Sequence, residues 1–300
     1  MRTIDQILKE IKELDLSTLP VDLINQLFNE FGIFGNITYT LHPRKRVYRA
    51  RTNNKNEIFK KVSDLSFLPS GLNSEYKRAS TPTSTMFYGA ILAEDIKEGE
   101  ITDNRIAGCF ECVDFLRDLT KKIDGENKVT FGTWIVTKDI PLIAIVFDKD
   151  LVNKSSYFTE MSEGFTKFIS EYPDLKDKTE KIYNYLASEF SKKQIDNGYD
   201  YLISSLFTKR VIDKGLKGVL YPSVRSDGAG YNVAIHPDAV KTSMKMVAAG
   251  ECTVYKKGDQ VIVDNETLAY LKDNDTEFEL KPVDSQYHLG KEKVYEKLNK

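Results

Sequence analysis

The longest uninterrupted apolar run in this 300-residue chain is short, and this limits the folds that are open to it. The run covers residues 141–147, whereas a helix needs about 20 apolar residues to span a bilayer, so we expect no membrane-embedded segment. Hydrophobic residues still make up 41% of the chain, which is enough for a sizeable globular core. The N-terminal residues MRTIDQILKEIKEL lack the apolar core of a secretory signal, so a cytoplasmic protein is expected.

The charge of the chain does not favour a polyanionic partner. Lys and Arg total 43 while Asp and Glu total 45, so the formal net charge is −2. Surfaces that bind nucleic acid are strongly basic, and we therefore expect no nucleic acid as a partner.

Two amphipathic helices are predicted at the N-terminus. Apolar residues recur at helical spacing within residues 4–14. A second helix is predicted over about residues 20–31, with Ser17 or Thr18 as its N-terminal cap. We interpret residues 1–35 as a helical arm attached to the domain that follows.

Three further segments have the spacing of helices. Residues 106–119 are periodic. Residues 163–193 are periodic as well, with Pro173 as an expected break near the start. The third segment covers residues 201–214 and is expected to end at a glycine, Gly215.

Short apolar or alternating runs predict the strands of the fold. They cover residues 37–40, 46–51, 86–90, 133–136, 142–147, 218–221 and 231–235. Between them, residues 67–85 are rich in Pro, Ser and Thr and predict a long loop, which is often functional. Residues 36–246 are taken as the main domain and 247–300 as a small C-terminal β extension, whose charged last residues are expected to fray.

The three cysteines suggest a reducing compartment and no metal site. Cys109 and Cys112 have CxxC spacing, but a zinc site needs about four ligands. The three histidines, His42, His236 and His288, are isolated from one another and from the pair. We therefore interpret the two cysteines as small apolar residues on a buried helix.

Four separated pieces of the sequence resemble the RES family, which is named for its Arg, Glu and Ser. The first is VYRAR at 47–51, and the second is KRAS at 77–80 followed by MFYGA at 86–90. The third is AGCFE at 107–111. The fourth, GLKGVLYPSVR at 215–225 followed by GAGYN at 228–232, is the most specific. Together they cover about residues 40–245, and Ser80 stands where the family often has Asn.

The resemblance implies a fold related to ADP-ribosyltransferases, that is, an α+β protein with a mixed, mostly antiparallel β core flanked by helices. It implies NAD+ as the substrate and cleavage of the nicotinamide–ribose bond, by hydrolysis, phosphorolysis or ADP-ribosyl transfer. Shorter family members act as toxins, so an antitoxin or a protein target is an implied partner. The alternative is a non-catalytic protein that uses the RES scaffold as a protein-interaction module. The oligomeric state and the acceptor stay open.

Cleavage of this bond builds positive charge on the ribose, as in glycoside hydrolysis, and a carboxylate stabilises that charge. We assign the carboxylate to Glu111, with Glu94 as the competing candidate. The two phosphates of NAD+ need planar, bidentate donors. Arg49 and Arg78 are the candidates, with Arg51 in reserve.

The remaining candidates shape the site around the reacting bond. Tyr88 is expected to form a flat wall for the nicotinamide ring. Ser223, on a turn fixed by Pro222, is expected to hold a ribose hydroxyl or to orient the glutamate. Asn232 is expected to fix the neighbouring backbone. Each residue alone has an ordinary structural explanation, so the prediction depends on their joint order along the chain.

Overall fold

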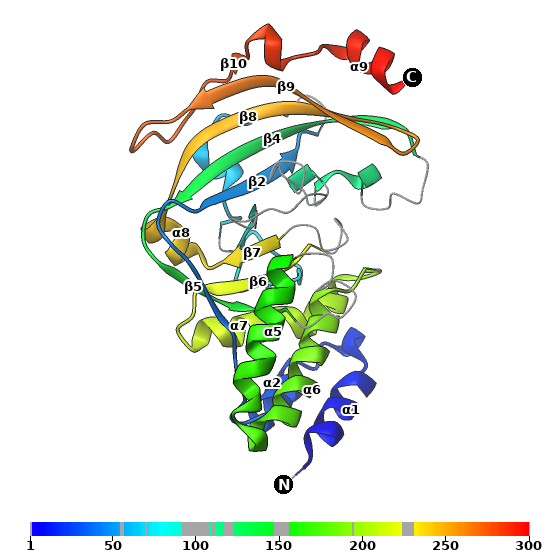
Figure 1. Ribbon diagram of the computed structural model, residues 1–300, viewed down its shortest axis with the longest axis vertical. Helices are drawn as coiled ribbons and strands as arrows, with labels where there is room; N and C mark the ends of the chain where they lie inside the picture. Colours follow the sequence, from blue (N-terminus) through cyan, green and yellow to red (C-terminus); the bar gives the residue numbers. More distant parts are fainter. Residues whose placement is uncertain are drawn as a thin grey trace.

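A single ten-stranded sheet runs through the described part of the chain (Figure 1). The structure is a computed structural model that describes residues 2–54, 57–69, 71–91, 108–109, 112–116, 123–146, 156–193, 195–223 and 231–299, without the side chains of 114 and 156–158. The spatial order of the strands is β1-β5-β6-β7-β3-β2-β4-β8-β9-β10. Only β5 and β6 pair in parallel, so the predicted α+β fold with a mixed, mostly antiparallel sheet is confirmed.

The seven predicted strands are present to within three residues at each end, except that β4 begins eight residues earlier than predicted. The bounds of the strands are β1 Thr38–Leu41, β2 Arg46–Thr52, β3 Phe87–Ile91, β4 Gly125–Val136, β5 Ile140–Ala144, β6 Gly218–Pro222, β7 Tyr231–Ile235, β8 Met244–Lys257, β9 Gln260–Tyr270 and β10 Lys281–Pro282. The first half of β4 was not predicted. Its polar residues Lys128 and Thr130 face side-chain partners, whereas Val129 and Phe131 are buried on the opposite face.

Seven α-helices lie in the described ranges. Their bounds are α1 Ile4–Glu13, α2 Val21–Glu30, α5 Ser156–Ser170, α6 Pro173–Phe190, α7 Leu202–Asp213, α8 Pro237–Ser243 and α9 Lys291–Leu298. Pro173 begins α6 and Gly215 follows α7 with a φ of +95°, as predicted. In this part of the chain no helix has the length and apolar character needed to cross a membrane.

Two details of the helices differ from the sequence prediction. The expected cap of the second helix is wrong, because Asp15 caps a short 3-10 turn at residues 16–18 and α2 begins after Pro20 without a side-chain cap. The charged C-terminus was expected to fray but forms α9. Val294 and Leu298 are buried there against the ring of Tyr255, which stabilises this short helix through tertiary packing.

The helices α1, α2, α6 and α7 cover one face of the sheet at β5, β6 and β7 (Figure 1). Successive side chains of β6 point to opposite faces of the sheet. Val219 and Tyr221 belong to the hydrophobic cluster with these helices, whereas Leu220 belongs to a second cluster on the other face. That second cluster includes Phe87 and Trp134. The two N-terminal helices thus share a hydrophobic cluster with the sheet, while the domain limits at 35 and 246 remain a prediction.

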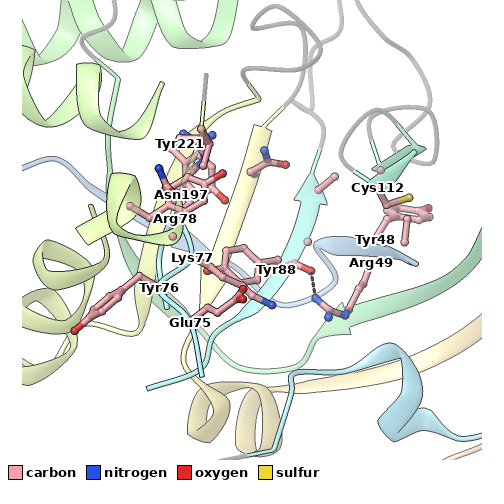
Figure 2. A pocket seen from close by; sticks show the side chains of 18 of the residues that line it. Tyr48, Arg49, Glu75, Tyr76, Lys77, Arg78, Tyr88, Cys112, Asn197 and Tyr221 are labelled. Carbon is pink, nitrogen blue, oxygen red and sulfur yellow. Dashed lines mark hydrogen bonds between the residues drawn. The ribbon is translucent and has the colours of Figure 1, made fainter. Parts of the chain in front are cut away.

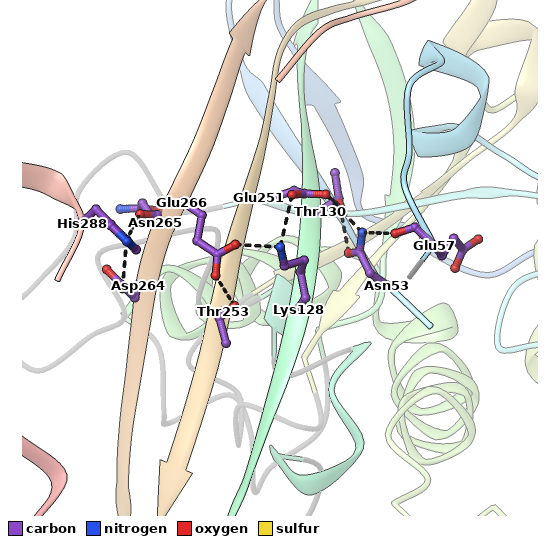
Figure 3. A network of polar contacts seen from close by, with 10 residues as sticks. All are labelled: Asn53, Glu57, Lys128, Thr130, Glu251, Thr253, Asp264, Asn265, Glu266 and His288. Carbon is purple, nitrogen blue, oxygen red and sulfur yellow. Dashed lines mark hydrogen bonds and ion pairs between the residues drawn. The ribbon is translucent and has the colours of Figure 1, made fainter. Parts of the chain in front are cut away.

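The long strands β4, β8 and β9 carry a polar network on one face (Figure 3). Lys128 lies 2.8 Å from Glu266 and 3.7 Å from Glu251. Hydrogen bonding to Glu266 is the main cause that raises the pKa of Lys128. Thr253 donates to Glu266, so three adjacent strands are joined by side chains as well as by backbone.

Strands β2, β3, β7 and β6 lie side by side at the centre of the sheet, and this order positions the candidate site. The approach of β2 to β3 is unusually close at Gly89. A Cβ atom added there would lie 2.4 Å from Cγ1 of Val47, so only glycine fits. On the other side of β3, Ala90 pairs with Asn232 of β7, and Asn232 in turn pairs with Tyr221 of β6.

Candidate functional site

A cavity of about 540 Å³ opens over these central strands. Its walls come from five parts of the chain: β2 and β3, the ends of β6 and β7, the loop at residues 75–78, the segment at 195–201, and the pair Gly108 and Cys112. A volume of this size is typical of a small-molecule site. Figure 2 shows Arg49 and Cys112 on one side of the cavity and Arg78 and Asn197 on the other, with Tyr88 between them.

Arg49 on β2 is the most unusual polar residue in the cavity. Its Nη1 donates a hydrogen bond of 3.0 Å to the carbonyl oxygen of Tyr88, and its guanidinium lies 5.5 Å from the ring centre of Phe87. Its Nε is buried and has no hydrogen-bond partner among the residues that the structure describes. Burial, with the nearby charge of Arg51 as a smaller cause, lowers the pKa of Arg49 to about 10, so the side chain is still a cation at neutral pH.

Arg51 lies two residues along the same strand, but its contacts are those of a structural residue. It donates to the carbonyl oxygen of Asp64 at 2.7 Å, pairs with Glu57 at 3.6 Å, and stacks over the ring of Phe59. It does not line the cavity. Of the two strand arginines, Arg49 is therefore the one that is available to a ligand.

Tyr88 on β3 lines the cavity, and its hydroxyl group is held by two neighbouring residues. Its hydroxyl accepts a hydrogen bond from the backbone N–H of Ala79 at 3.0 Å and lies 2.9 Å from Oγ of Ser80. Burial raises the pKa of Tyr88 to about 12, so the phenol is neutral at physiological pH. The Ser80 hydroxyl also accepts from the N–H of Met86, which closes the loop that precedes β3.

Arg78 lines the cavity, and it already donates hydrogen bonds to two backbone carbonyl groups. It donates to the carbonyl oxygens of Phe190 and, at 3.0 Å, Lys192, beyond the last turn of α6. Its guanidinium also lies 5.2 Å from the ring centre of Tyr201. A cation at the C-terminus of a helix is favourable for the helix dipole, so Arg78 has a structural role whether or not it contacts a ligand.

Asn232 and Ser223 lie at the end of the cavity formed by β6 and β7. Asn232 lines the cavity and is 7% exposed. Ser223 follows β6 directly and is fully buried, so it does not belong to the cavity wall. Tyr221, two residues earlier on the strand, lines the wall and packs 5.4 Å from the ring centre of Phe190.

Glu111 and Glu94, the two candidate carboxylates, lie outside the residues that the structure describes. Gly108 and Cys112, on either side of Glu111 in the sequence, both line the cavity. Cys109 is buried with Cys252 in a separate hydrophobic cluster, against which Cys112 packs. Within the described ranges, no three His, Cys, Asp or Glu side chains come close enough together to hold a metal ion.

The cavity also has a wall that sequence reasoning missed. Ile195, Asp196, Asn197 and Gly198 line it together with Tyr201. The only local signal was the Asn197–Gly198 dipeptide, which predicts a turn and says nothing about a ligand. Residues 195–201 connect α6 to α7, and both helices pack against the face of the sheet on which Val219 and Tyr221 of β6 lie. This packing brings the connection to the cavity.

Part of the chain matches a known protein family. Residues 173–254 match the family model of the RES domain. No curated protein is similar enough in sequence to count as a relative. The matched part covers α6, α7, β6, β7 and α8 and runs into β8, and it contains Tyr221, Ser223 and Asn232 of the candidate site. Arg49, Arg78, Tyr88 and Glu111 precede it in the chain. The cavity is therefore formed in part by the matched segment, and the chain contains a RES domain.

Proposed function

We propose that this protein binds NAD+ in the central cavity and cleaves the bond between nicotinamide and ribose. The observation that carries the proposal is the environment of the Arg49 side chain. The Arg49 side chain is half-buried, and among the described residues its buried Nε has no hydrogen-bond partner and no carboxylate forms an ion pair with it, which costs folding free energy. A phosphate group entering the cavity would supply the missing acceptor and the opposite charge.

The other residues around the cavity fit the same ligand. The Tyr88 ring is fixed by Ala79 and Ser80 and offers an apolar face to a nicotinamide ring. Asn232 of β7, which pairs with Ala90 of β3, lines the same cavity. Ser223 is buried behind this wall, so in the proposal it acts by orienting its neighbours and not by touching the substrate.

The chemistry requires a carboxylate, which the proposal assigns to Glu111. When the C1′–N bond breaks, both electrons of the bond go to the nicotinamide ring and the positive charge develops on the ribose. Glu111 stabilises that charge. The oxygen of water, of phosphate or of a protein side chain then bonds to C1′. Where the acceptor is water, the proton that it loses goes to the carboxylate.

The test is an assay of free nicotinamide with purified full-length protein and NAD+. Glu111→Gln is expected to lower kcat by at least about a hundredfold with little change in KM, because the carboxylate acts in the transition state. Glu94→Gln is the matched control and is expected to retain wild-type turnover. Loss of turnover in Glu94→Gln alone would move the assignment to Glu94, and no release of nicotinamide by the wild type would end the proposal.

The products identify the acceptor and the biological role. Free ADP-ribose indicates water, its 1″-phosphate indicates phosphate, and label from NAD+ retained on protein indicates ADP-ribosyl transfer. A toxin is expected to arrest growth on expression and to be neutralised by a dedicated protein partner. Binding of NAD+ without nicotinamide release would instead support the non-catalytic interaction module.

A further inference from the structure

The cavity wall at residues 195–201 has little regular structure to hold it. It connects α6 to α7 and contains only a single 3-10 turn, Gly198–Tyr201. A connection of this kind is fixed by its hydrogen bonds. The described residues of this segment show which contacts hold it against the cavity.

The carboxylate of Asp200 organises the middle of the wall. Its Oδ2 accepts hydrogen bonds from the backbone N–H groups of Asp196 and Asn197, each at 2.9 Å. Both of these residues line the cavity. The position of Asp200 therefore sets the position of two wall residues.

Lys192 connects this wall to the end of α6. Its Nζ lies 2.6 Å from Oε2 of Glu189 and donates to the backbone carbonyl of Asp200 at 3.3 Å. Glu189 is only 7% exposed; burial raises its pKa, and the charge of Lys192 opposes that shift. A buried carboxylate is stabilised by a neighbouring cation, so the ammonium group of Lys192 is held next to Glu189. Lys192 itself does not line the cavity.

Arg78 lies on the same side of the cavity and holds the residues around this segment (Figure 2). It donates to the carbonyl oxygens of Phe190 and Lys192 and lies over the ring of Tyr201. The residues just before the segment and Tyr201 at its end are thus tied to the loop at 75–78. Gly198 also approaches this loop, since an added Cβ would lie 3.6 Å from the carbonyl oxygen of Tyr76.

We propose that Lys192 is a positioning residue for ligand binding: bridging Glu189 and Asp200, it holds the 195–201 wall where it contacts a bound dinucleotide. The inference rests on the proposed function for the identity of the ligand. Because the wall lies across the cavity from Cys112, which follows the proposed carboxylate Glu111 directly in the sequence, it contacts parts of the dinucleotide away from the reacting bond (Figure 2). Lys192 therefore acts on binding and not on bond cleavage.

The first measurement needs no NAD+. Hydrogen–deuterium exchange is followed in peptides that cover 195–201, in the wild type, Lys192→Met and Lys192→Arg. Exchange is expected to become about tenfold faster in Lys192→Met, because the amides bonded to Asp200 lose protection. The arginine variant keeps a cation between Glu189 and Asp200 and is expected to return exchange to within about twofold of wild type. Unchanged exchange in Lys192→Met would overturn the proposal.

The second measurement is nicotinamide release. Lys192→Met is expected to raise KM for NAD+ by about five- to tenfold with kcat within about twofold, the signature of lost uniform binding. Lys209→Met, which removes the surface pair of Lys209 with Asp213 on α7, is the matched control and should leave both constants unchanged. A fall in kcat at constant KM, or faster exchange with no change in KM, would contradict the role given to Lys192.

The two measurements separate this inference from the proposed function. If the wild type releases no nicotinamide, the proposed function fails, while the exchange data still decide whether Lys192 holds the wall. If Lys192→Met folds poorly, Glu189→Gln weakens the same bridge while keeping the shape of the side chain. It is expected to change exchange in the same direction by a smaller factor, and exchange as slow as in wild type would count against the bridge.

Discussion

Arg49 and Arg51 show how two identical residues on one strand come to differ. Arg51 has an acceptor, an ion pair and an aromatic ring around it, whereas Nε of Arg49 has no partner within the described part of the chain. The pKa of Arg49 is about 10 in the folded protein, which is below the ordinary value of an arginine. Between the folded and the ordinary pKa, the folded state binds fewer protons than the unfolded state. In that pH range this group makes the free energy of unfolding rise with pH. At neutral pH the full cost of burying the charge is present.

Substitution of the two arginines should therefore have opposite effects. Arg49→Met is expected to leave the free energy of unfolding within about 1 kcal/mol of wild type, because a buried charge without a carboxylate partner is removed along with one hydrogen bond. It is expected to weaken NAD+ binding by at least about tenfold. Arg51→Met is expected to cost about 1–2 kcal/mol of stability and to leave NAD+ affinity within about twofold.

Urea unfolding and calorimetric titration with NAD+ would measure both effects. The reverse pattern, a large loss of stability in Arg49→Met with unchanged affinity, would show that Arg49 is a structural residue.

Among the secondary-structure elements, the close approach of β2 and β3 is what brings Arg49 and Tyr88 together. Their ladder has one recorded pair, Tyr48 with Ala90, so few backbone hydrogen bonds define it. Gly89 allows the approach because the space that a side chain would need is filled by Val47. The hydrogen bond from Arg49 to the carbonyl of Tyr88 depends on that spacing.

Gly89→Ala is expected to lower the free energy of unfolding by about 1–3 kcal/mol, because the added methyl group overpacks the contact between the strands. The control is Gly164→Ala on α5, where an added Cβ meets nothing within 4 Å. There the substitution is expected to stabilise the protein by about 0.5–1 kcal/mol, because glycine weakens helix interiors. A urea midpoint for Gly89→Ala equal to that of wild type would contradict the steric argument.

For the whole molecule, the C-terminal segment is fastened to the sheet by a buried carboxylate. Asp264 of β9 is 2% exposed and accepts hydrogen bonds from the N–H groups of Leu289 and Gly290, at 2.8 and 3.0 Å. His288 lies 3.1 Å from the same carboxylate (Figure 3). These contacts set the start of α9, which then covers the ring of Tyr255.

Asp264→Ala is expected to cost about 2–3 kcal/mol, because two backbone donors lose a charged acceptor and α9 loses its anchor. Asp273→Ala removes an exposed partner of Lys245, 2.7 Å away, and is expected to cost less than about 1 kcal/mol. Urea unfolding of the two variants gives the comparison. Equal midpoints would mean that the C-terminal segment adds nothing to the stability of the sheet.

Local patterns in the sequence were enough to predict most of the helices and strands, because the periodicity of buried residues and the positions of Pro and Gly are local properties. The α6 break at Pro173, the end of α7 at Gly215 and the hairpin of β6 and β7 were all predicted. The first half of β4 and α9 were missed. Both carry mostly polar residues, and their apolar side chains are buried only by partners distant in the sequence.

For the candidate site, too, some features could be predicted from local sequence and others depended on tertiary contacts. The sequence by itself determined which residue types are present in which order, and Arg49, Arg78, Tyr88 and Asn232 do line one cavity. Only the tertiary structure decided that Arg49 has an unpartnered Nε, that Arg78 is engaged by carbonyl groups, that Ser223 is buried, and that residues 195–201 form a wall. A hydrogen bond or a burial depends on atoms brought together from distant parts of the chain, and no local pattern encodes them.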